Sequence, residues 1–80
     1  MSVSLKTHQE VFELMASING KILNPSSFSH GTFTVILPPE YQAMAFSIMN
    51  LYRHIGWNCR ITYVGPPGYR QEAIMFFVYD

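Results

Sequence analysis

The spacing of apolar positions near the start of the chain predicts a helix. From Val11 to Ile18, apolar side chains recur every three or four residues, which is the repeat of one helix face. Thr7 and Glu10 precede this stretch with the spacing of a capping box, in which each side chain binds a backbone N–H of the first turn. Asn19-Gly20 is expected to end the helix, because glycine readily adopts the left-handed conformation past a helix end.

A second and longer helix is predicted over residues 39–55. Pro39 suits the first position of a helix, where its missing N–H is not needed. Apolar and aromatic residues then follow at the helical repeat, and Gly56 is expected to end the helix. The residues of this repeat are Tyr41, Met44, Ala45, Ile48, Leu51, Tyr52 and Ile55.

Alternating apolar and polar positions, together with short apolar runs, predict four strands. They cover residues 21–23, 32–37, 57–64 and 73–79. Gly65-Pro66-Pro67-Gly68 separates the last two and is a typical turn sequence. The last strand is apolar on both faces, which indicates a central position in the sheet.

These elements predict a single α+β domain over residues 1–80 with the order α-β-β-α-β-β. The second helix is about as long as the predicted strands, so it can return the chain to a parallel strand. The final strand is expected to form a hairpin with residues 57–64 and to insert beside residues 32–37, as in a split β-α-β unit. The result is a small two-layer sandwich of about four mostly antiparallel strands, with both helices on one face.

Two helices cover only one face of such a sheet, and the other face is also expected to be apolar. The residues assigned to that open face are Ile36, Val64, Ile74, Phe76 and Val78. Ala43, Phe46 and Met49 turn away from the main stripe of the long helix, and Phe12 lies at the edge of the stripe on the first helix. Scattered surface apolar residues are common, but a contiguous open face exceeds the patch that monomers usually tolerate. A homodimer is the simplest expectation, because a twofold interface needs only one self-complementary patch.

Composition favours association over catalysis. Hydrophobic residues make up 49% of the 80 residues and charged residues only 12%, whereas an ordinary soluble domain carries about 25% charge. The formal net charge is zero, so no basic excess favours binding to nucleic acid. The first residues lack the apolar stretch of a signal peptide, and no apolar run approaches the roughly 20 residues that span a bilayer. We therefore expect a cytoplasmic protein that does not contact a membrane.

Few residues carry the chemistry of catalysis or metal binding. Cys59 is the single cysteine, which excludes an internal disulfide and a cysteine-built metal site. His8, His30 and His54 form no ligand motif. Cys59 and His54 offer a Cys–His dyad, but alternation places Cys59 on an apolar strand face, which favours a buried and unreactive thiol. No enzymatic activity, cofactor or metal is expected.

The sequence therefore predicts a small non-catalytic protein-binding module. We expect a homodimer that regulates or inhibits another protein, in the manner of compact accessory factors of viruses and mobile elements. The expected partner-binding residues are Phe46, Met49, Arg53, Tyr69, Arg70 and Phe76. Tyr and Arg are enriched at binding hot spots, and the prolines stiffen the turn that presents two of these residues.

An alternative function is the binding of a nucleotide-like anion at a dimer seam. Arginine side chains pair with phosphate oxygens, and aromatic rings stack on a base or on a cation. The ligand-binding residues would then be Arg60, Arg70, Tyr63 and Tyr69.

Overall fold

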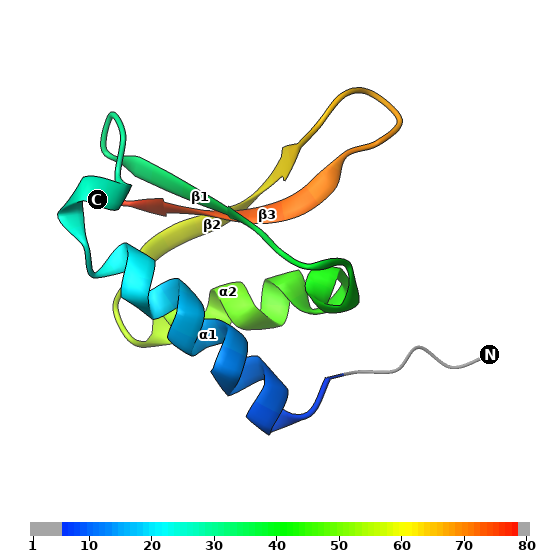
Figure 1. Ribbon diagram of the computed structural model, residues 1–80, viewed down its shortest axis with the longest axis horizontal. Coiled ribbons are helices and arrows are strands. Elements are labelled where there is room, and N and C mark those ends of the chain that lie inside the picture. The colour runs from blue at the N-terminus through cyan, green and yellow to red at the C-terminus, as the bar shows by residue number, and fades with distance from the viewer. Residues whose placement is uncertain (1–5, 79–80) are drawn as a thin grey trace.

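In residues 6–78, the part of the chain that the computed structural model describes, two α-helices lie on one face of a three-stranded antiparallel sheet (Figure 1). The helices are α1, His8–Ile22, and α2, Ala45–His54. The strands are β1, Thr32–Ile36, β2, Asn58–Val64, and β3, Gln71–Phe77. Two short 3₁₀ segments, Pro25–Ser27 and Pro39–Met44, precede β1 and α2 respectively.

α1 begins where the sequence predicts. The Oγ1 of Thr7 accepts a hydrogen bond from the N–H of Glu10 at 3.2 Å, and the Glu10 carboxylate accepts one from the N–H of Thr7 at 3.0 Å. These reciprocal bonds confirm the capping box. The Thr7 N–H and the Thr7 hydroxyl both donate to the Glu10 carboxylate, and with the nearby ammonium group of Lys6 they hold the pKa of Glu10 below its ordinary value of 4.5.

α1 ends later than the sequence predicts. The expected end at Asn19-Gly20 is wrong, and so is the expected strand at residues 21–23, because the helix continues through Ile22. Ile22 falls one turn after Ile18 and joins it on the buried face of the helix. Burial of this additional apolar side chain outweighs the modest destabilisation, of about 1 kcal/mol, that a glycine brings to a helix interior.

The second predicted helix is divided into two parts. Pro39–Met44 forms 3₁₀ turns, and only α2 is α-helical. Gln42 ties the 3₁₀ turns to the sheet: its Nε2 donates to the C=O of Leu37 at 3.1 Å, and its Oε1 accepts from the N–H of Glu72 at 3.4 Å. Such tight turns are frequent at the start of α-helices. Gly56 follows α2 with a φ of +102°, which confirms its predicted role in ending the helix.

β3 lies between β1 and β2 and pairs antiparallel with both, so its predicted central position is confirmed. β1 and β2 therefore run parallel to each other, and α2 lies on the connection between them. The described residues form three strands where four were predicted, and their order is α-β-α-β-β, because residues 21–23 do not form a strand. Tyr79, the predicted end of the last strand, lies outside the described residues.

Side chains beneath the sheet show which face the helices cover. Phe76 is fully buried, and its ring meets the rings of Tyr52 and Trp57 edge to face at centroid distances of 5.0 and 5.8 Å. Ile74 is fully buried as well. The assignment of Ile74 and Phe76 to the open face is therefore wrong. β3 is apolar on both faces, so alternation alone gives no sign of which face points inward.

The open face of the sheet is mixed rather than uniformly apolar. Strand alternation and register place on it the side chains of Thr32, Thr34, Ile36, Arg60, Thr62, Val64, Met75 and Phe77. The Arg60 guanidinium lies 5.2 Å from the centroid of the Phe77 ring, which is a cation–π distance. The predicted positions of Ile36 and Val64 are confirmed, but threonines separate the apolar side chains.

Candidate functional site

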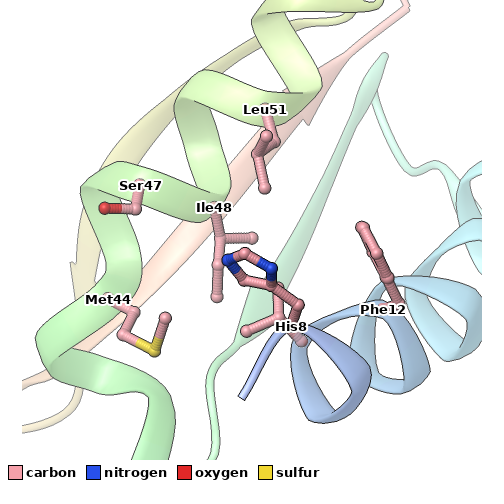
Figure 2. Close-up of a pocket in the computed structure, with 7 residues that line it drawn as sticks. His8, Phe12, Met44, Ser47, Ile48 and Leu51 are labelled. Carbon is pink, nitrogen blue, oxygen red and sulfur yellow. The ribbon is translucent and has the colours of Figure 1, made fainter. Parts of the chain in front are cut away.

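An apolar groove between α1 and α2 is the candidate binding site. It encloses about 450 Å³. His8, Val11 and Phe12 line it from α1, and Met44, Ser47, Ile48 and Leu51 line it from the other side. Figure 2 shows the side chains of His8, Phe12, Met44, Ile48 and Leu51 around the space between the two helical segments.

Helix periodicity explains why these residues meet. The α1 side chains stand at positions i, i+3 and i+4, and those of the α2 segment stand at i, i+3, i+4 and i+7. Residues at these spacings share one helix face, so each helix presents one continuous stripe to the groove. Val11 and Ile48 are buried, whereas Phe12 is 63% exposed and Leu51 is 42% exposed. The groove therefore has an apolar floor and two accessible apolar side chains, Phe12 and Leu51.

Two tyrosines, Tyr52 of α2 and Tyr41 of the 3₁₀ turns before it, connect these elements with α1. The Tyr52 hydroxyl lies 3.1 Å from the C=O of Met15 and 2.9 Å from the Oδ1 of Asn19. The Tyr41 hydroxyl donates to the C=O of Glu10 at 3.3 Å. Each tyrosine ring therefore spans the distance between its own element and α1. Contact through these long side chains keeps the two elements far enough apart to leave room for the groove. Burial raises the pKa of Tyr52 to about 12.

Among residues 6–78, the groove is lined by only two polar side chains, the imidazole of His8 and the hydroxyl of Ser47, and by no carboxylate. The His8 ring lies 6.5 Å from the Phe12 ring between centroids, and Ser47 contributes a hydroxyl on the opposite wall. The lining includes no Asp, Glu, Lys or Arg. Such a site accommodates apolar side chains, and the described part of its lining has no carboxylate, ammonium or guanidinium group with which to hold an ion.

The structure separates the predicted partner-binding residues of the long helix. Phe46 is 59% exposed but lies on another side of α2, because it is offset by two residues from Met44 of the groove. Met49 is buried in the core and contributes nothing to an exposed surface, so its assignment to the outside is wrong. The Arg53 side chain is held in place, since its Nε donates to the C=O of Cys59 at 2.9 Å. Phe76, also predicted at the interface, is a core residue.

The turn between β2 and β3 has the predicted form. Gly65 and Gly68 both have positive φ values, of +122° and +89°, and the N–H of Tyr69 donates to the C=O of Pro66 at 3.0 Å. Tyr69 and Arg70 are exposed beside it, as the sequence predicts. They lie on the hairpin and not in the groove.

Within one copy of the chain, the residues proposed for anion binding at a dimer seam lie apart. Arg60 and Tyr63 are separated by an odd number of positions on β2, so their side chains point to opposite faces of the sheet. Arg60 is in register with Met75 of β3, and Arg70 lies five residues before Met75. At about 3.4 Å per residue, Arg60 and Arg70 are about 17 Å apart along the strand direction.

Cys59 has the properties of a structural thiol. It is 1% exposed, and its Sγ donates to the C=O of Met49 at 3.7 Å. Burial raises its pKa, against the opposing effect of the nearby Arg53 guanidinium, so the reactive thiolate is disfavoured. Within residues 6–78, no group of three or more His, Cys, Asp or Glu side chains is placed to hold a metal ion.

The sequence did not identify Phe12 and Leu51, the two exposed apolar residues of the groove. It assigned Leu51 to the core stripe and Phe12 only to the edge of a stripe. The position of Phe12 off the main stripe was the available signal.

Among the described residues, no helix has the length and apolar character that crossing a membrane requires. No protein-family model, no curated protein and no solved structure matches this chain.

Proposed function

We propose that this chain is a small non-catalytic module that binds another protein through the groove between α1 and α2. The observation that carries the proposal is the pair of exposed apolar side chains, Phe12 and Leu51, beside an apolar floor. Aromatic and aliphatic side chains around such a hollow are typical anchors of protein interfaces. Helices that bind in apolar grooves use residues at i, i+3, i+4 and i+7 in the same way.

The dimensions of the groove favour an amphipathic helix as the partner segment. The wall from Met44 to Leu51 spans seven residue steps, which is about 10 Å or two helical turns. A partner helix that presents two apolar side chains one turn apart fits this length. The lack of charge in the lining favours apolar over charged partner side chains. Occupation of a partner's helix in this way would regulate or inhibit that partner.

Anion binding has less support as a function. Arg60 is separated from Arg70, and Tyr63 points to the opposite face, so the four residues do not surround one ligand within one copy, and such a site needs residues of two copies. The exposed Tyr69 and Arg70 remain available to a protein partner that also contacts the hairpin.

A displayed library of random 16-residue peptides, selected against the immobilised chain, tests the groove directly. We expect the recovered peptides to share apolar residues at helical spacing. Leu51→Asp should weaken their binding about tenfold or more, because burial of a leucine contributes about 1.5–3 kcal/mol and about 1.4 kcal/mol is a factor of ten in affinity. Titration of labelled peptides by fluorescence anisotropy provides the measurement.

Phe46→Asp is the matched control, because Phe46 is similarly exposed on α2 but does not line the groove. Circular dichroism of both variants checks that the helices are retained. Equal binding of the peptides to the parent chain and to Leu51→Asp would refute the groove as the binding site. So would loss of binding in Phe46→Asp alone.

A further inference from the structure

The two edges of the sheet differ in what covers them. β1 and β2 are both edge strands, because β3 lies between them. Unpaired N–H and C=O groups along an edge are a template for another strand unless side chains or loops block them. We propose that the edge of β1 pairs with β1 of a second copy of this chain, in antiparallel orientation about a twofold axis.

Hydrogen bonds at the two ends of β1 establish which of its backbone groups face outward. The N–H of Leu37 donates to β3 at 3.3 Å, and the C=O of Gly31 accepts a bond from the residue after β3 at 3.0 Å. In an antiparallel ladder, the backbone N–H and C=O groups of one residue point to the strand on one side, and those of the next residue point to the other side. The odd-numbered residues of β1 therefore bond to β3, and the N–H and C=O groups of Thr34 and Ile36 point to the open edge.

The chain itself already satisfies the first outward position of β1. The N–H of Thr32 donates to the C=O of Ser29 at 3.1 Å, and the C=O of Thr32 accepts from the N–H of Ser29 at 2.9 Å. No such contact within residues 6–78 reaches the outward groups of Thr34 or Ile36. Two donors and two acceptors are thus left on consecutive outward positions, and Ile36 is 46% exposed.

β2 has a charged side chain bound at one outward position, near the start of the strand, whereas the outward backbone groups of Ile61 and Tyr63 accept or donate no such bond within residues 6–78. The same alternation turns the C=O of Cys59 outward, and the Nε of Arg53 donates to it at 2.9 Å. A charged side chain in this position occupies the space that an added strand would need. β1 has the sequence Thr-Phe-Thr-Val-Ile, with no charged residue and no proline to discourage pairing.

One register satisfies every outward group of β1. With Val35 on the twofold axis, Thr34 lies opposite Ile36 of the second copy, and the two residues exchange both backbone bonds. The twofold repeats this pair, so that four hydrogen bonds cross the seam. Val35 then faces Val35 of the second copy in a close pair, with a Cα separation of about 4.5 Å. Ser29 at one end and Pro38 at the other confine the pairing to the short segment between them.

Amide hydrogen exchange of the unmodified chain tests the seam, in samples from about 10 µM to about 1 mM that bracket weak and moderate affinities. The amides of Thr34 and Ile36 should become at least tenfold more protected as the concentration rises, and light scattering should show an increasing dimer fraction. The amides of Phe33 and Val35 should stay protected at every concentration, because their bonds go to β3. A chain that remains monomeric at every concentration overturns the proposal. So does an exchange rate of the Thr34 amide that is the same at the lowest and the highest concentration.

Single cysteines test the register. Val35→Cys should oxidise to a covalent dimer, because the expected Cα separation lies within the range that a disulfide spans. Thr34→Cys should cross-link much more slowly, because in this register each thiol lies opposite Ile36 of the second copy and not opposite the other thiol. Faster cross-linking of Thr34→Cys than of Val35→Cys would overturn this register.

Proline provides a test that is matched between the two edges. Thr34→Pro removes an outward N–H of β1 without removing a bond to β3, so it should give a folded monomer. Tyr63→Pro is the equivalent change on β2 and should leave the dimer intact. Should Thr34→Pro lose its circular dichroism signal, Ile36→Lys provides the charged edge residue instead and should also prevent dimers. Dimers that persist in a folded Thr34→Pro or Ile36→Lys variant, or that are lost in Tyr63→Pro, overturn the choice of edge.

Discussion

At the scale of the residue, Phe76 and Phe46 show how position alone separates a core role from a surface role. Both were expected at a partner surface, yet Phe76 is fully buried against Tyr52 and Trp57, whereas Phe46 is 59% exposed. Truncation of a buried phenylalanine to alanine costs about 3–5 kcal/mol. A domain of this length has a total unfolding free energy of roughly 4–12 kcal/mol.

We therefore expect Phe76→Ala to be largely unfolded or severely destabilised, and Phe46→Ala to lie within about 0.5 kcal/mol of the parent chain. Urea titrations followed by circular dichroism give the two free energies of unfolding. Similar stabilities for the two variants would contradict the burial of Phe76. A charged residue at position 76 would likewise unfold the chain rather than disturb an interface, because Phe76 is fully buried.

At the scale of the element, α1 depends on tyrosine hydroxyls for its connection to α2. Tyr52 is fully buried, and its hydroxyl lies within hydrogen-bond distance of Met15 and Asn19 in α1. Tyr52→Phe should lower the free energy of unfolding by about 0.5–1.5 kcal/mol, the usual net contribution of one hydrogen bond. Tyr63→Phe, at an exposed position, should leave the stability unchanged. Thermal denaturation of both variants measures the difference, and equal melting temperatures would speak against this bridge.

The raised pKa of Tyr52 predicts how the free energy of unfolding responds to alkaline pH. This pKa is raised from 10.0 to about 12, so the unfolded chain loses this proton at a lower pH than the folded chain does. The stabilisation is complete below pH 10 and is lost as the pH rises through about 12. Tyr52→Phe should remove this part of the alkaline decline, which denaturation midpoints between these pH values can show. A decline of the same size in both proteins would mean that another group is responsible.

The elements that the sequence predicted well are those specified by local chemistry. The capping box at Thr7 and the end of α2 at Gly56 each depend on a few adjacent residues. The central place of β3 followed from its two apolar faces. The end of α1 was wrong because Ile22 is held in the helix by packing that involves distant residues, and tertiary contacts override a local stop signal.

The groove was less predictable than the fold, because it depends on how two helices are spaced. Leu51 has the periodicity of a core residue, and only the gap created between α1 and α2 leaves it 42% exposed. Likewise, nothing in a strand that is apolar on both sides identifies the inner face. The partners on β1 and β2 decide it, since Phe76 is in register with Phe33 and Cys59.

At the scale of the whole molecule, the apolar surplus of the sequence is distributed over separate surfaces. Large apolar side chains are exposed beside the groove at Phe12 and Leu51, on the open face of the sheet at Ile36, and on the hairpin at Tyr69. The groove and the edge of β1 share no residue. Changes at distant sites without common partners usually have additive effects.

We therefore expect two separable losses of binding. Leu51→Asp should lose the selected peptides and keep the dimer, and Thr34→Pro should lose the dimer and keep the affinity of each groove for a peptide. The double variant should lose both. Light scattering and peptide titration of the three variants check this independence, and coupling of the two losses would show that the surfaces act as one.

Because Cys59 is buried, the alkylation of its thiol can be used to measure how often the core opens. A thiol that is 1% exposed, and whose pKa is raised by burial, reacts with an alkylating reagent only in moments when α2 and the sheet separate. Because the chain has a single cysteine, each modified molecule records one such event. The rate of labelling, read by mass spectrometry, thus follows the opening of the core without any engineered probe.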